Sequence, residues 1–103
     1  MIDKITTLKN MLVQAPHDCF LWHALGLEHI KRGELIDAIT SFKQVLAADK
    51  NYVGTYYHLA KTYALTEQIN LAIETYEQGI QIAQQLNDKH ALQELRMALE
   101  DME

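Results

Sequence analysis

The sequence predicts an all-helical protein, and three observations lead to this fold class. Apolar residues recur at three- and four-residue spacing along most of the chain, as they do on the buried face of a helix. No stretch shows the strict alternation of a half-buried strand. The 103 residues include one proline and four glycines, so few positions interrupt long helices. We expect a single domain over residues 1–103, because a chain of this length buries one modest core.

Six helices are expected from the apolar spacing, at residues 2–14, 19–32, 35–48, 53–66, 69–86 and 88–102. Pro16 follows the first helix, and Asp18 is suited to cap the second. We expect Gly33 to end the second helix in a left-handed conformation. Glu67 holds the equivalent turn position after the fourth helix, so a positive φ is expected there too. Asn87 marks the boundary before the last helix.

The second half of the chain repeats the first at a distance of 34 residues. The first copy has Trp22, Leu25, Gly26, His29, Ala38 and Phe42, which match Tyr56, Leu59, Ala60, Tyr63, Ala72 and Tyr76 in the second. Such a period is typical of stacked helical hairpins. Gly26 with Ala38, and Ala60 with Ala72, place small residues where the two helices of a hairpin cross closely. The aromatic residues are expected to be core between hairpins rather than a cofactor site.

With these residues the chain resembles the tetratricopeptide repeat family. The resemblance divides the chain into a leading half-repeat helix at 2–14, repeats at 19–52 and 53–86, and a C-terminal capping helix at 88–102. Pro16 stands at the closing proline of the half repeat, whereas Lys50 and Gln84 replace that proline in the two full repeats. His29 replaces the usual tyrosine, and Ala60 the usual glycine. The resemblance implies a right-handed superhelical stack of antiparallel helix hairpins with terminal capping helices.

A second, mostly apolar stripe on helix 19–32 is not explained by the packing pattern. It consists of Phe20, His23, Leu27 and Ile30, and the corresponding positions of the second repeat hold Gly54, Tyr57, Lys61 and Ala64. The resemblance implies that these residues line a concave groove, which we expect to be apolar at one end and cationic toward Arg96. The competing interpretation is that the stripe packs against a terminal helix.

A protein or peptide partner is the ligand that the resemblance implies. Family members that grip a peptide's terminal carboxylate use Lys and Asn at the positions held here by His23 and Leu27. We therefore expect an internal peptide segment, a partner helix or a second copy of the chain instead. The function expected is non-catalytic binding of a partner protein, as an adaptor or scaffold. The alternative is self-assembly into a homo-oligomer, such as a homodimer, through the same apolar stripe.

Several other functions are disfavoured by composition and motifs. The formal charge of -5 argues against nucleic acid and anionic membrane surfaces. No apolar run has the length of a membrane span, and the first residues do not resemble a signal peptide, so a cytoplasmic location is expected. His17, His23 and His29 recur every six residues, which turns them to different helix faces, so no metal is expected. No nucleotide or nucleophile motif is present, so we expect neither an enzyme nor a cofactor.

Overall fold

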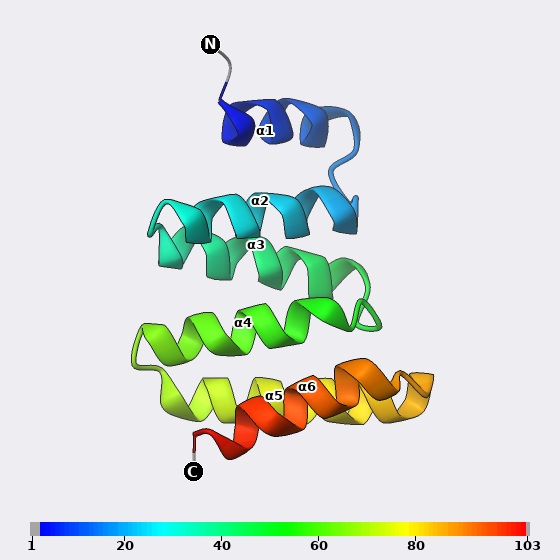
Figure 1. Cartoon of the computed structure of the whole chain (residues 1–103). Helices are drawn as coiled ribbons and strands as arrows, with labels where there is room; N and C mark the ends of the chain where they lie inside the picture. The colour runs from blue at the N-terminus through cyan, green and yellow to red at the C-terminus, as the bar shows by residue number, and fades with distance from the viewer. Residues whose placement is uncertain (1–2, 103) are drawn as a thin grey trace. The chain divides into compact units, whose positions relative to one another are not determined.

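The structure, a computed structural model, describes residues 3–102, and every regular element in that range is an α-helix (Figure 1). The helices are α1 (Lys4–Gln14), α2 (Cys19–Lys31), α3 (Leu35–Ala48), α4 (Gly54–Leu65), α5 (Ile69–Leu86) and α6 (Lys89–Glu100). The predicted all-helical fold is confirmed, with helix ends within about two residues of those expected. Residue 2, where the first helix is expected to begin, lies outside the described residues. Within residues 3–102, no helix combines the length and apolar character needed to cross a membrane.

Aspartate side chains mark the starts of three helices. Asp18 accepts a hydrogen bond from the backbone N–H of Leu21 at 3.1 Å, as expected for the cap of α2. Asp88 accepts one from the N–H of Ala91 at 3.0 Å, and Asp3 caps α1 in the same way. Because a capping residue has extended rather than helical backbone angles, Asp88 stays outside α6. This explains why α6 begins one residue later than expected.

Left-handed residues follow three of the helices. Gly33 has a φ of +74° after α2, Glu67 a φ of +63° after α4, and Asn87 a φ of +55° after α5. Glycine adopts this conformation without steric cost, and asparagine tolerates it better than most residues. Glutamate has neither advantage, so the turn at Glu67 carries local strain. The positive φ expected at Glu67 is confirmed.

The described residues form two compact units, one up to Lys50 and the other from Asn51 onward. In the first unit α2 packs against both α1 and α3. A Cβ placed on Gly26 would lie 2.5 Å from Cε1 of Phe42, so only glycine lets α2 approach the Phe42 ring this closely. The buried apolar residues of this unit are Ile5, Leu12, Leu21, Leu25, Ala38, Ile39, Phe42 and Val45.

In the second unit α5 packs against both α4 and α6, and α6 also contacts α4. The helices approach closely at Gly79. A Cβ at Gly79 would lie 2.7 Å from Cβ of Tyr56 and 3.1 Å from Cδ1 of Leu95. The sequence pattern does not single out Gly79, because the first repeat has Val45 at the equivalent position. The buried apolar residues here are Tyr56, Leu59, Ala60, Tyr63, Ala72, Tyr76, Ala83, Ala91 and Leu95.

Trp22 is less buried than its counterpart Tyr56. It packs at the edge of the apolar cluster that joins α1 and α2. Its Nε1–H donates a hydrogen bond to the carbonyl oxygen of Pro16 at 2.8 Å. An indole N–H needs an acceptor, and this one lies in the exposed connection after α1, so the ring stays at the edge of the core.

Candidate functional site

The four α2 residues of the expected groove lie along the first unit and differ in exposure. Phe20 is 67% exposed, which is unusual for a large aromatic side chain. Leu27 and Ile30 are half-buried. His23 is also half-buried, and its ring centroid lies 5.5 Å from that of Phe42. The stripe therefore presents apolar surface to solvent at one end while its middle part rests on the core.

The α4 residues of the expected groove centre on Tyr57. Its ring centroid lies 6.5 Å from that of Tyr76, in an edge-to-face arrangement that rests the half-buried ring on the core of the second unit. The Lys61 ammonium nitrogen lies 5.8 Å from the centroid of the Tyr57 ring, within cation–π range. Ala64 continues this face and is half-buried, while Gly54 begins the helix and is exposed. The structure thus brings Tyr57 and Lys61 together.

A hollow of about 210 Å³ lies between α4 and α6 beside Tyr57. Its other lining residues are Glu94, Met97 and Ala98, which share one face of α6, and Asp101, which follows the helix directly. Arg96 is not among them. It lies two residues beyond Glu94, about 200° around the helix, because each residue advances the chain by about 100°. The expectation of a cationic end toward Arg96 is therefore not met at this hollow, where two carboxylates stand instead.

The surroundings of this hollow also affect the pKa of His58. Burial lowers its pKa below the usual histidine value, the nearby Glu94 carboxylate opposes that effect, and Lys61 adds to it. The imidazole is therefore held in its neutral form more firmly than a free histidine. Burial likewise raises the pKa of the Tyr76 hydroxyl, so this group stays protonated. These residues offer neutral hydrogen-bonding groups and carboxylates, and no activated nucleophile is apparent among them.

One group among the described residues has the spacing of a metal site, which the sequence pattern does not indicate. The ligand atoms of His29, Glu34 and Asp37 all lie within 4.8 Å of one another. His29 is buried, and its Nδ1 lies 2.9 Å from Oε1 of Glu34. This contact ties the end of α2 to the start of α3, at the place where the second hairpin has Tyr63. A structural hydrogen bond explains the arrangement, so we assign no metal to it.

The predicted groove residues fall into two sets on different compact units. The α2 set belongs to the first unit, and Tyr57, Lys61, Ala64 and Arg96 belong to the second. Sequence reasoning missed Glu94, Met97 and Asp101, although their spacing of three and four residues places them on one helix face. What the sequence lacks is any sign that this face is the one directed toward Tyr57.

Comparison with known proteins gives a consistent family relationship. A tetratricopeptide repeat family model matches residues 29–99. A tetratricopeptide repeat domain protein from Salinibacter ruber is 38% identical over 82% of this chain and 94% of that protein's chain, with a TM-score of 0.78. No curated protein sequence matches the chain.

Two more distant structures share the fold. A protein from Bordetella parapertussis is 24% identical and covers 99% of this chain and 89% of its own, with a TM-score of 0.85. The TPR2B domain of yeast Sti1, solved in a complex with pHsp70, is 17% identical and covers 95% of this chain and 78% of its own, with a TM-score of 0.89. The predicted tetratricopeptide repeat fold is confirmed by these matches.

Proposed function

We propose that this chain, which belongs to the tetratricopeptide repeat family, binds another protein through the open face of α4, and that the apolar stripe of α2 is a second contact surface on the other unit. Domains of this family generally mediate protein–protein interactions and are generally non-catalytic. We accordingly assign the chain no enzymatic reaction and no cofactor, and expect an adaptor or scaffold role in the cytoplasm. The complex of the yeast Sti1 domain with pHsp70 supports ligand binding by this fold.

The observation that carries the proposal is the open face of α4. Leu59 and Tyr63 are buried in the core of the second unit, whereas Tyr57 and Lys61 keep part of their surface exposed. The edge-to-face contact with Tyr76 already restricts the Tyr57 ring, so a ligand that packs on it causes little further loss of side-chain entropy. Tyrosines of this kind commonly dominate the affinity of protein interfaces.

The charges around Tyr57 favour a ligand segment with a basic residue next to an apolar one. Glu94 and Asp101 supply two carboxylates to the hollow, which suit an arginine or lysine side chain. Met97 is 59% exposed beside them and offers a flexible apolar contact. The Lys61 ammonium, 5.8 Å from the centroid of the Tyr57 ring, suits an acidic group of the ligand. This chemistry describes an internal peptide segment of mixed charge.

The α2 face contributes apolar surface in this proposal. Phe20 is the most exposed of its residues, and Leu27 and Ile30 extend the same stripe. Association through the same stripe with a second copy of the chain is the competing function. Both functions require α2 to keep this stripe uncovered in the free protein.

Peptides selected from a random display library on the wild-type protein supply the ligands for a test. Tyr57→Ala should weaken their binding by about tenfold or more, because it removes the central aromatic contact. Leu27→Glu should also prevent binding, while changing the free energy of unfolding by no more than about 0.5 kcal/mol. Ile36→Glu is the matched control: Ile36 is a 66% exposed apolar residue on α3, and its replacement should leave binding unchanged.

Three results would count against the proposal. Unchanged peptide affinity in both folded variants would mean that the ligand binds elsewhere. Unfolding of Leu27→Glu would show that the α2 stripe belongs to the core. A stable dimer in sedimentation analysis that Leu27→Glu dissociates would favour self-assembly instead.

A further inference from the structure

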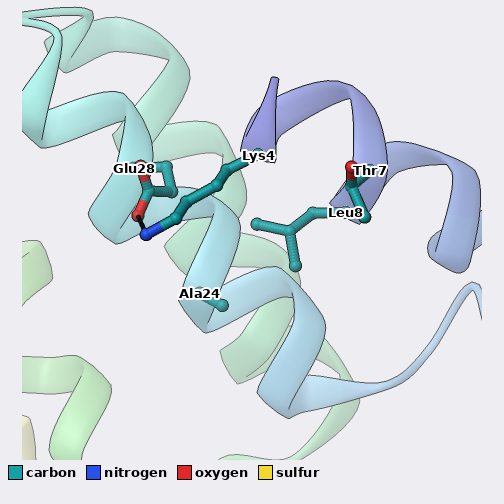
Figure 2. A pocket seen from close by; sticks show the side chains of 5 residues that line it. All are labelled: Lys4, Thr7, Leu8, Ala24 and Glu28. Atoms are coloured by element: carbon teal, nitrogen blue, oxygen red, sulfur yellow. Dashed lines mark ion pairs between the residues drawn. The ribbon is translucent and has the colours of Figure 1, made fainter. Parts of the chain in front are cut away.

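The hollow between α1 and α2 has balanced charges. Its volume is about 270 Å³, and it is lined in part by Lys4 on α1 and Glu28 on α2, whose charged groups are 3.9 Å apart (Figure 2). Leu8 and Ala24 supply its apolar part. Because the two charged side chains already pair with each other, the described lining of this hollow selects neither cations nor anions.

The hollow between α4 and α6, which we call the α4–α6 hollow, has an excess of negative charge. Glu94 and Asp101 are the charged residues that line it, and neither forms an ion pair with another residue in the range 3–102. Lys61 lies over the Tyr57 ring but does not line the hollow. Two carboxylates beside an aromatic side chain are therefore available to a ligand.

The two carboxylates also affect neighbouring groups of α4 and α5. Burial lowers the pKa of His58, and the Glu94 carboxylate acts in the opposite direction. Burial raises the pKa of the Tyr76 hydroxyl, and Tyr57 and Asp101 raise it further. A cation that binds between Glu94 and Asp101 would be attracted by both carboxylates.

The charge of the chain is divided unequally between its two units. Residues 1–50 contain six lysine and arginine residues and six acidic residues, whereas residues 51–103 contain three and eight. The formal charge of -5 therefore belongs entirely to the second unit. Such a field attracts a cationic ligand and speeds its association, and the α4–α6 hollow lies in the unit that produces the field.

Arginine suits this hollow better than lysine does. Glu94 and Asp101 lie at the two ends of the lining that the α6 segment supplies, with Met97 between them. A guanidinium has five N–H donors in one rigid plane and can pair with two carboxylates at once, whereas an ammonium is a compact point charge. The guanidinium is also less strongly hydrated, so its transfer from water to a partly apolar site costs less free energy. Its methylene stem can pack on the Tyr57 ring.

We propose that the α4–α6 hollow binds an arginine side chain from a basic segment of another protein, in preference to lysine. The guanidinium donates hydrogen bonds to Glu94 and Asp101, while the methylenes of the arginine pack on Tyr57 and Met97. The inference rests on the proposed function, since it names the ligand residue that the open face of α4 selects.

Short capped peptides of alanine, in which leucine follows one central variable residue, test this preference. The variable residue is arginine, lysine or citrulline, and citrulline has nearly the shape of arginine without its charge. Binding to the full chain is measured by NMR titration of backbone amide resonances. The arginine peptide should bind about fivefold more tightly than the lysine peptide and about tenfold more tightly than the citrulline peptide. It should shift the resonances of Glu94, Met97 and Asp101.

Variants of the full chain locate the binding site. Glu94→Gln and Asp101→Asn should each weaken binding of the arginine peptide by about threefold or more, and should reduce its advantage over the lysine peptide. Both residues are exposed, so we expect both variants to fold. Glu100→Gln is the matched control, because it removes the same charge from an exposed residue of α6 that does not line the hollow. It should change the affinity by less than about twofold.

Four results would overturn the proposal. They are equal affinity for the arginine and lysine peptides, an equal effect of Glu94→Gln and Glu100→Gln, resonance shifts confined to the first unit, and no binding of the arginine peptide at millimolar concentration. A dimer of the chain that Glu94→Gln dissociates would assign the hollow to a second copy and would overturn the proposal as well.

Failure of the proposed function would look different. In that case the peptides selected from the display library would bind Tyr57→Ala and Leu27→Glu as tightly as they bind the wild-type protein. Library peptides that require Tyr57 but tolerate replacement of their arginine by lysine would refute only the preference for arginine.

Discussion

Exchanging the residue types at two equivalent turns tests how local backbone strain contributes to stability. Gly33 and Glu67 are 34 residues apart, and both have a positive φ. The turns also share their hydrogen bonds: the N–H after each residue donates to the carbonyl five residues earlier at 2.9 Å, from Glu34 to His29 and from Gln68 to Tyr63. Because the two backbones agree, the residue types at the two left-handed positions can be compared directly.

The expected magnitudes follow from two opposing effects. A left-handed conformation costs a residue with a Cβ about 1 to 2 kcal/mol relative to glycine. Glycine in turn loses about 0.4 to 1 kcal/mol more conformational entropy on folding. No atom lies within 4 Å of a Cβ built on Gly33, so no steric clash adds to the balance. Gly33→Ala should therefore lower the free energy of unfolding by about 1 kcal/mol, and Glu67→Gly should leave it unchanged or raise it by up to about 1 kcal/mol.

Urea denaturation followed by circular dichroism measures both changes, and the double variant should show their sum, since distant sites add. The informative result is that Gly33→Ala lowers the free energy of unfolding while Glu67→Gly does not. A clear loss of stability in Glu67→Gly, together with no change in Gly33→Ala, would refute the reasoning. It would mean that the glutamate side chain stabilises its turn by more than the backbone strain costs.

Three further changes test the core, the electrostatics and a helix cap. Gly79→Ala should lower the free energy of unfolding in urea by about 1 to 2 kcal/mol, because the added Cβ would press on Tyr56; unchanged stability would show that the helices separate easily. Stability should decline as the pH falls below about 6.5, because burial lowers the pKa of folded His58 and the unfolded chain binds that proton more readily. His58→Asn should flatten this part of the pH profile, and an equal slope would assign it to other groups. Asp88→Ala should lower the free energy of unfolding by about 1 kcal/mol, measured by thermal melting, because it removes the side-chain cap of α6. An unchanged melting temperature would show that the backbone N–H of Ala91 donates to another acceptor.

Some residues beside the hollow of α4 and α6 were predicted from the sequence, and others were not. Tyr57 and Lys61 were predicted as groove residues because the 34-residue repeat pairs them with His23 and Leu27, and the Lys61 ammonium lies over the Tyr57 ring, as residues four apart can on a helix surface. Arg96 was expected beside them, but Glu94 and Asp101 line the hollow instead. Spacing shows which residues of α6 share a face. It does not show how α6 is rotated about its own axis against α4.

By itself the sequence determined the helices, their ends and the repeat, because these depend on interactions between residues close in the chain. The bond from Asp18 to the next turn and the left-handed backbone at Gly33 span only a few residues. The tertiary structure alone decided which helix faces meet, because that depends on contacts between distant residues. Leu95 of α6 approaches Gly79 of α5, and this contact directs the carboxylate of Glu94 toward α4, a direction that helical periodicity cannot predict.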